Sequence, residues 1–230
     1  WLKLAIIKIR QIRKRNKTPI LVGGTGLYFN SLINGLVKIP NIPTKFRNKI
    51  RLMQKTHGQY KFYKKLLKID PKVKDKINRN DSQRSIRAYE IKSYSKKSMY
   101  DWISQTKPSF KQQEFLKLYI NFERKKLIER IEKRTIKMIK LGAVKEVKKF
   151  KTLKLSDHSS VKKIIGIQEL GKFLEKKIKI EEAKKLISIK TRQYAKRQAT
   201  WARSKMTTWH RIDPKDFQFW TKKMSQSHKD

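Results

Sequence analysis

The chain has 230 residues, and its 61 lysines and arginines against 18 acidic residues give a formal net charge of +43 at pH 7. Hydrophobic residues make up 37% and aromatic residues 10% of the chain, which is enough for a packed core and argues against a disordered polyelectrolyte. The absence of cysteine excludes disulfides, thiolate nucleophiles and cysteine-based zinc sites. So basic a chain is expected to bind a polyanion, with nucleic acid the first candidate and an anionic membrane surface the second.

The amino-terminal residues predict a helix, a buried strand, a glycine turn and a second helix. The run Ile20-Leu21-Val22 is short, apolar and β-branched, as in strands buried on both faces. It ends at Gly23-Gly24-Thr25-Gly26, and residues 27–36 then resume helical spacing. This order indicates a unit of a parallel α/β sheet. The apolar face of the first helix is formed by Leu2, Ala5, Ile6, Ile9 and Ile12.

The rest of the chain is predicted to be mainly helical. Residues 44–113 contain helical stretches and no evident buried strand, so we expect a helical insertion there. Residues 1–43 and 114–230 are expected to form a partial α/β core. Within the core, the pattern predicts strands at 115–120 and 209–212, helices at 123–150 (with a break near Gly142), 164–174 and 181–204, and a loose polar tail. The helices expected in the insertion are 46–54, 60–67 and 82–95.

The glycine turn is the first candidate site. Glycines allow a ligand to approach the backbone, and the helix that follows presents free N–H groups and the positive end of its dipole. Thr25 stands where a hydroxyl can cap that helix or contact a phosphate. A tight turn with a threonine cap is the alternative. The turn is no Walker A loop, since no Gly-Lys-Ser/Thr follows it.

Three further segments carry residues suited to nucleic acid. In 80–87, Asn80 or Ser82 is expected to cap a helix that begins with Gln and Arg side chains, although these are equally consistent with an ordinary solvated helix. In 181–204, basic residues at steps of seven, four and seven form a stripe mixed with aromatics, which favours RNA contact over a merely solvated face. Arg130 and Arg134 are spaced to clamp one phosphate, or else to pair with neighbouring glutamates. The stripe is Lys185, Arg192, Lys196 and Arg203.

The order of these motifs resembles the tRNA dimethylallyltransferase family, also called tRNA isopentenyltransferases. The similarity runs from Pro19 to about Asp213 and is most specific in its first and last motifs. The motifs are Pro19-Ile20-Leu21-Val22-Gly23-Gly24-Thr25-Gly26-Leu27-Tyr28-Phe29, Asn80-Asp81-Ser82-Gln83-Arg84-Ser85-Ile86-Arg87-Ala88-Tyr89-Glu90, Arg130-Ile131-Glu132-Lys133-Arg134, Ile164-Ile165-Gly166 and Thr191-Arg192-Gln193-Tyr194-Ala195-Lys196-Arg197-Gln198-Ala199-Thr200-Trp201.

The resemblance implies an enzyme that moves a dimethylallyl group from dimethylallyl diphosphate to the exocyclic amine of the adenine 3′ of the anticodon, at tRNA position 37. It implies a P-loop-NTPase-like parallel sheet, a helical insertion that holds the anticodon arm, Mg²⁺ and bound nucleotide, and a monomer in the cytoplasm, away from membranes. Thr25 and Arg47 would be catalytic, and Gly23, Gly24, Thr25, Arg130 and Arg134 would bind the diphosphate. The tRNA would be contacted by Gln83, Arg84, Ser85, Ile86, Arg87, Lys163, Ile164, Ile165, Gly166, Ile167, Gln168, Arg192, Lys196, Arg197, Gln198, Trp201 and Arg203.

Two family features are absent from these 230 residues. One is the phosphate-binding loop that ends Gly-Lys-Ser/Thr, and the other is the aspartate that acts as general base. We therefore expect the chain to be the carboxyl-terminal two-thirds of such an enzyme, as a fragment or as a split or decayed gene product, and to be inactive alone. A separate amino-terminal segment would complement it, and the magnesium ligands would come from that segment and from the substrate diphosphate. The alternatives are a non-catalytic tRNA-binding remnant and a generic basic nucleic-acid-binding protein.

Overall fold

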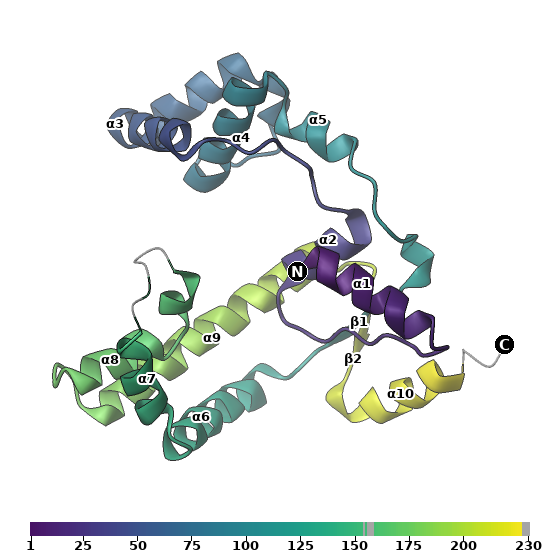
Figure 1. The fold of residues 1–230 in the computed structure, drawn as a ribbon, viewed down its shortest axis with the longest axis vertical. Coiled ribbons are helices and arrows are strands. Elements are labelled where there is room, and N and C mark those ends of the chain that lie inside the picture. The colour runs from purple at the N-terminus through teal and green to yellow at the C-terminus, as the bar shows by residue number, and fades with distance from the viewer. Residues whose placement is uncertain (154, 156–158, 227–230) are drawn as a thin grey trace. The chain divides into compact units, whose positions relative to one another are not determined.

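The computed structural model describes residues 1–153, 155 and 159–226, and it divides the chain into two compact units (Figure 1). Unit 1 contains Trp1–Pro19 and Leu27–Phe115, and unit 2 contains Ile20–Gly26 and Leu116–Asp230. The predicted insertion, 44–113, thus lies within unit 1, together with Trp1–Pro19 and residues 27–43.

Unit 1 begins with α1 (Leu2–Arg13) and α2 (Gly26–Asn34), the latter belonging to it from Leu27 onward. The predicted face of α1 is confirmed, since its five apolar residues are buried or half-buried while Leu4 and Ile7 are exposed. The Arg13 guanidinium donates to the Glu114 carboxylate over 2.6 Å, which fixes the end of α1 on the 3₁₀ turn η2 (Gln112–Glu114).

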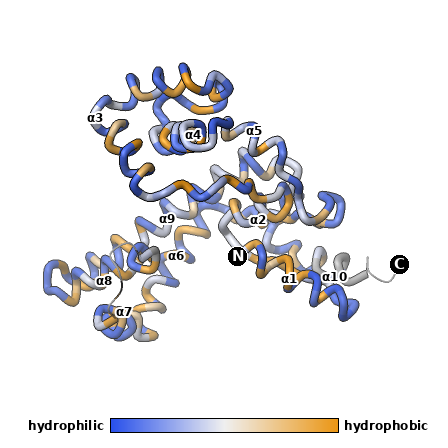
Figure 2. Tube along the Cα trace, turned by 45° about the horizontal axis from the view of Figure 1, so that its top comes forward, coloured by the Kyte–Doolittle hydropathy of each residue, from blue (hydrophilic) through white to orange (hydrophobic). Residues whose placement is uncertain are grey.

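The remainder of unit 1 is a helical subdomain. It contains α3 (Thr44–Ile69), η1 (Pro71–Val73), α4 (Ser82–Ser95) and α5 (Met99–Ser104). Figure 2 colours the residues of these helices by hydropathy, and hydrophobic and hydrophilic residues alternate along them. Gly58 interrupts α3 with φ +72° and ψ 163°, so the two predicted stretches are confirmed as two helices joined at a glycine. Leu66, Val73, Ile77 and Ala88 form the core between α3, η1 and α4.

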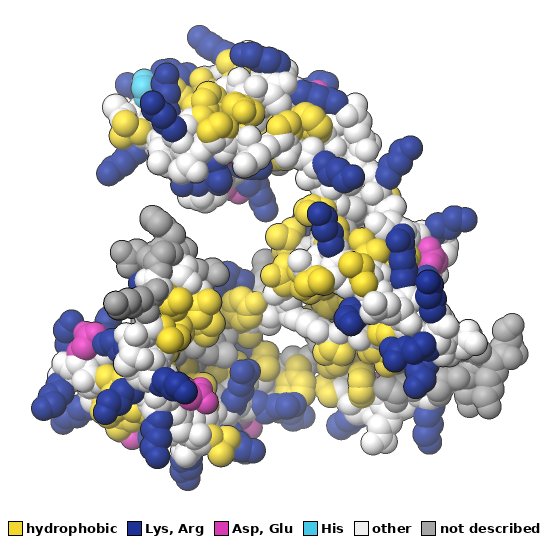
Figure 3. Space-filling model, viewed as in Figure 1, with side chains coloured by type: hydrophobic (Ala, Val, Ile, Leu, Met, Phe, Trp, Pro, Cys, Tyr) yellow, Lys and Arg dark blue, Asp and Glu magenta, His cyan; other side chains and the backbone are white. Residues whose placement is uncertain are grey.

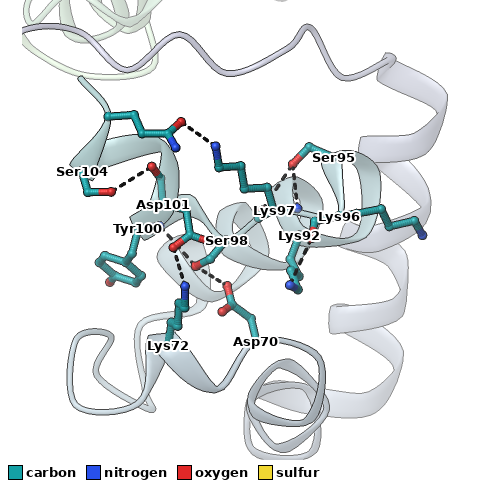
Figure 4. A network of polar contacts seen from close by, with 11 residues as sticks. Asp70, Lys72, Lys92, Ser95, Lys96, Lys97, Ser98, Tyr100, Asp101 and Ser104 are labelled. Carbon is teal, nitrogen blue, oxygen red and sulfur yellow. Dashed lines mark hydrogen bonds and ion pairs between the residues drawn. The ribbon is translucent and has the colours of Figure 1, made fainter. Parts of the chain in front are cut away.

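A polar network fastens α5 to η1 within this subdomain (Figure 4). The hydroxyl of Ser98 donates to the buried Asp70 carboxylate over 2.8 Å, and the Lys72 ammonium donates to Asp101 over 2.6 Å. Ser98 also caps α5 by accepting from the Tyr100 N–H. The cap of α4 differs from the prediction, because Asp81 rather than Asn80 or Ser82 accepts the Arg84 N–H.

Unit 2 combines a small parallel sheet with several packed helices. Strand β1 (Leu118–Ile120) pairs with β2 (His210–Ile212), which places Ile120 opposite Ile212. Between the strands run α6 (Arg124–Lys140), α7 (Ala143–Lys151), η3 (Ser160–Lys163), α8 (Ile167–Leu174) and α9 (Ile180–Lys205). Ala143, Val147, Leu170, Ala183 and Ile187 make the core of this unit. Gly142, with φ +103°, separates α6 from α7, so the predicted break is confirmed.

Two predictions for unit 2 are wrong. The run 20–22 is not a strand in the described structure, where Ile20 and Val22 are 67% and 89% exposed, because no described strand pairs with it. The part of the tail that the structure describes is not loose, since η4 (Pro214–Asp216) leads into α10 (Phe217–Gln226), and residues 227–230 lie outside the described residues. An aromatic contact between His210 and Trp220, whose rings stack at 5.6 Å, connects α10 to β2.

Candidate active site

The glycine turn of unit 2 is held against the carboxyl-terminal half of α9. The side-chain amide of Gln198 donates to the Gly24 carbonyl oxygen over 2.9 Å. A Cβ added to Gly24 would lie 2.1 Å from Gln198 Nε2, and one added to Gly26 would lie 2.1 Å from the Trp201 ring. The Trp201 ring therefore favours glycine at position 26, while the Gln198 side chain lies close to Gly24 but can move. Gln198 and Trp201 thus reach the turn that is predicted to bind diphosphate.

Thr25 stands at the centre of this contact and is exposed. It immediately precedes Gly26, the first residue of α2. The first N–H groups of a helix have no partner within the helix and point along a dipole that favours anions. The hydroxyl of Thr25 and these N–H groups can therefore donate hydrogen bonds to a phosphate, while Gln198 and Trp201 contact the backbone of the turn.

The remaining basic residues predicted for unit 2 lie on the surfaces of α6 and α9. Arg130 and Arg134 are on the exposed side of α6, where the Arg130 guanidinium stacks over Phe122 at 5.0 Å. Arg192 approaches Glu132 of α6 at 3.8 Å, so this glutamate pairs between helices. The side chains of Lys196, Arg197 and Arg203 are exposed along α9, which is the arrangement of a polyanion-binding face.

The residues of the predicted loop 163–168 fall into an exposed group and a buried or half-buried group. Lys163, Ile164 and Gln168 are exposed, whereas Ile165 and Ile167 pack on the core of unit 2. Gly166 adopts φ +107° and is buried. Three of these residues can therefore face a ligand, while the others serve the fold.

Glu169 fastens the start of α8 to α9. It is 3% exposed, accepts the Gly166 N–H over 2.8 Å and pairs with the Lys190 ammonium. Burial opposes ionisation of this carboxyl, but the hydrogen bonds from Lys190 and the backbone outweigh burial and lower the pKa of Glu169 from its ordinary 4.5. The exposed Glu175, between Lys151 and Lys177, has a pKa lowered to about 2 by those two lysines.

The predicted site residues of unit 1 lie on α3 and α4. Gln83 and Arg84 are exposed on the first turn of α4, but Ser85 is fully buried and donates to the Asp81 carbonyl over 2.7 Å. Arg47 and Arg87 both approach the buried Glu90, at 3.6 and 3.3 Å. Ile86 is half-buried on the same helix.

The site residues predicted from the sequence do not include two members of this group, Arg51 and Glu90, although Glu90 ends the motif 80–90. Arg51 Nε lies 3.8 Å from Glu90 Oε1, so three arginines converge on one carboxylate. The signal was present as a spacing of four between Arg47 and Arg51 and of three between Arg87 and Glu90, each of which places two residues on one helix face.

The described residues contain no group of three His, Asp or Glu side chains able to hold a metal ion. They thus offer no ligand set for the magnesium ion that the resemblance implies, and we assign none of them to it. No helix in the described part of the chain combines the length and apolar character that crossing a membrane requires.

Comparison with known proteins places the chain in a family. The family model described as IPP transferase matches residues 1–205. A tRNA dimethylallyltransferase of Pelagibacter ubique is 61% identical over 99% of this chain and 72% of its own length, and one of Rickettsia massiliae is 39% identical over 90% of this chain and 57% of its own length.

Solved structures agree. A tRNA isopentenylpyrophosphate transferase of Bacillus halodurans, 30% identical, matches with a TM-score of 0.58 over 99% of this chain and 70% of its own. A eukaryotic dimethylallyltransferase described as acting on tRNA, 26% identical, matches with a TM-score of 0.73 over 98% of this chain and 58% of its own. The family match over most of the chain and the identity to the Pelagibacter ubique protein show that the chain belongs to the IPP transferase family.

Proposed function

We propose that this chain acts in the transfer of a dimethylallyl group from dimethylallyl diphosphate to the exocyclic amine of adenine 37 in tRNA. Family membership and the names of its relatives support the reaction class. The observation that carries the proposal is the glycine turn, where an exposed threonine precedes a helix start and α9 holds the backbone in place. We also propose that the chain acts as a monomer in the cytoplasm.

In this reaction the bond between the allylic carbon and the diphosphate oxygen breaks, and a bond from the adenine nitrogen to that carbon forms. The diphosphate leaves with the bonding electron pair, so negative charge grows on its oxygens. The Thr25 hydroxyl and the N–H groups at the start of α2 are placed to stabilise that charge as it develops. Magnesium bound to the diphosphate would supply further charge neutralisation. The adenine amine loses a proton, for which we assign no base among these residues.

The basic faces of the two units would hold the tRNA. In Figure 3 lysine and arginine side chains occupy much of the visible surface of each unit, with few carboxylates among them. The sequence carries 61 basic against 18 acidic residues, so this excess is general. Backbone phosphates supply most of the affinity of a protein for nucleic acid, and side chains at the flipped adenine would supply the selectivity.

The experiment is incorporation of labelled dimethylallyl diphosphate into tRNA by the wild-type chain and by Thr25→Ala, each mixed with an amino-terminal segment of the Pelagibacter ubique relative. Thr25→Ala should lower transfer on the order of 10²-fold, because one donor to the leaving diphosphate is lost. Affinity for tRNA should stay within about twofold. Equal transfer by both proteins would remove Thr25 from the mechanism.

The same assay tests the chain without the added segment. We expect no detectable transfer by the 230 residues alone, since general-base assistance contributes roughly 10²–10⁴ in rate. Transfer by the isolated chain at the rate of the mixture would contradict that expectation. Binding of tRNA without transfer in any mixture would instead favour a non-catalytic role.

A further inference from the structure

Glu90 of α4 is a buried carboxylate surrounded by three arginines of unit 1. Its side chain is 2% exposed, and its oxygens lie 3.6 Å from Arg47 Nε, 3.8 Å from Arg51 Nε and 3.3 Å from Arg87 Nη1. Two of these arginines come from the first turns of α3 and the third from α4. We call Arg47, Arg51, Arg87 and Glu90 the arginine cluster.

The geometry of the cluster is looser than a structural ion pair requires. Glu90 Oε1 and Arg47 Nε are both buried and have no hydrogen-bond partner. A buried carboxylate costs several kcal/mol unless it is paired at close range, and a single bidentate arginine would be enough to pair it. Glu90 has three arginines at 3.3–3.8 Å, which is more than the one needed to neutralise its charge.

The charge balance leaves two positive charges on an accessible surface. Three guanidinium groups face one carboxylate, and their side chains are 40%, 54% and 41% exposed. Without Glu90 these groups would repel one another and spread into water. With it, the three partly exposed guanidinium groups are held together at one carboxylate, and such a convergence of arginines can bind a tetrahedral oxyanion.

We propose that Glu90 is a positioning residue that assembles Arg47, Arg51 and Arg87 into a binding site for one RNA phosphate, with Arg51 contributing a contact that the sequence motifs do not include. Glu90 itself touches no RNA in this arrangement, since it is buried beneath the arginines. The identity of the RNA as tRNA rests on the proposed function, whereas the phosphate site rests on the cluster alone.

The test compares RNA affinity across salt concentrations for the full chain and for Arg51→Gln, Glu90→Gln and Lys49→Gln. Lys49 is the matched control, because it is an exposed cation of α3 that lies between Arg47 and Arg51 in sequence but two residues from each, and so on another face. Each lost phosphate contact lowers the slope of log K against log salt by about 0.7–0.9.

Arg51→Gln should reduce the slope by about that amount, and Lys49→Gln should leave it near the wild-type value. Glu90→Gln should weaken binding several-fold and lower the slope by about one phosphate contact, although it raises the net charge of the protein. Circular dichroism confirms that each variant is folded. If Glu90→Gln does not fold, the comparison of Arg51→Gln with Lys49→Gln decides alone.

Two outcomes would overturn the proposal. Tighter RNA binding by Glu90→Gln with an unchanged slope would mean that Glu90 only neutralises charge. Equal slopes for Arg51→Gln and Lys49→Gln would remove Arg51 from the site. Repeating the series on polyuridylate separates this question from the proposed function. A slope change on both RNAs without preference for tRNA would support the cluster and contradict the tRNA assignment.

Discussion

Individual residues in unit 2 show how the fold restricts side chains at the glycine turn. Gly24 and Gly26 both lie against α9, but their neighbours differ in stiffness. Gly24 meets the flexible end of Gln198, whereas Gly26 meets the rigid indole of Trp201. The same added methyl group should therefore have unequal consequences at two positions only two residues apart.

Gly26→Ala should lower the stability of the chain by about 1–3 kcal/mol, because the indole cannot yield without repacking. Gly24→Ala serves as the control and should cost clearly less, since the Gln198 amide can rotate away at the loss of one hydrogen bond. Denaturant unfolding of both variants measures the difference. A smaller loss for Gly26→Ala than for Gly24→Ala would contradict the packing of Trp201 on the turn.

Residue patterns predict the features that depend on one segment of this chain, but not the contacts between segments far apart in sequence. The apolar face of α1 and the break at Gly142 follow from spacing and from glycine within one segment, and both are confirmed. The arginine cluster depends on α3 meeting α4, which no single segment encodes. Likewise 20–22 has the composition of a strand, but strand formation requires a partner from elsewhere in the chain.

At the scale of elements, α8 depends on a buried charge at its beginning. Glu169 accepts the Gly166 N–H and pairs with Lys190, and its pKa is lowered in the folded state. A group with a lowered folded pKa binds its proton more weakly in the folded than in the unfolded chain. Its stabilisation is therefore complete above the unfolded value of 4.5 and is lost as the pH falls through the folded value.

Glu169→Gln should lower the unfolding free energy at pH 7 by about 1–3 kcal/mol, because a buried charge-assisted pair is lost. The difference from wild type should shrink as the pH is lowered below 4.5, where the wild-type carboxyl also becomes neutral. Unfolding curves between pH 3 and 7, with Glu181→Gln as an exposed glutamate control, test this. A difference that is independent of pH would indicate a loss of shape rather than of charge.

Two glycines of unit 2, Gly142 between α6 and α7 and Gly171 within α8, should change the stability in opposite directions when each is replaced by alanine. Gly142 has φ +103° with open space around its Cα, and Gly171 lies within α8 with no atom within 4 Å of an added Cβ. Gly142→Ala should destabilise by about 1 kcal/mol through backbone strain, whereas Gly171→Ala should stabilise by up to about 1 kcal/mol through helix propensity. Thermal unfolding measures both shifts, and equal signs would contradict the assigned backbone conformations.

At the scale of the whole molecule, the net charge of +43 should control the rate at which the chain associates with a polyanion such as RNA. On the face that Figure 3 shows, lysine and arginine side chains lie on both units rather than at one motif, so many separate side chains contribute to the long-range attraction. Such attraction raises association rates and is strongly weakened by salt.

Affinity for tRNA should fall on the order of 10³–10⁵-fold between 50 and 200 mM salt if six to ten phosphates are contacted. Filter binding or fluorescence anisotropy measures this directly, with a random DNA duplex as competitor. Stronger binding of tRNA than of the duplex is expected from an enzyme of this family. A flat response to salt would contradict polyanion binding, and equal competition by the duplex would indicate a generic basic protein.

The pairing of β1 with β2 has a consequence for how unit 2 folds. Two strands of three residues each close a loop that spans residues 121–209. Closing this loop costs more chain entropy than the contacts among α6, α7, α8 and α9, whose core residues Ala143, Val147, Leu170, Ala183 and Ile187 are separated by shorter stretches of chain. We therefore expect the helices to form first and the strands to close last, so a substitution that weakens β2 should accelerate unfolding and leave the folding rate almost unchanged.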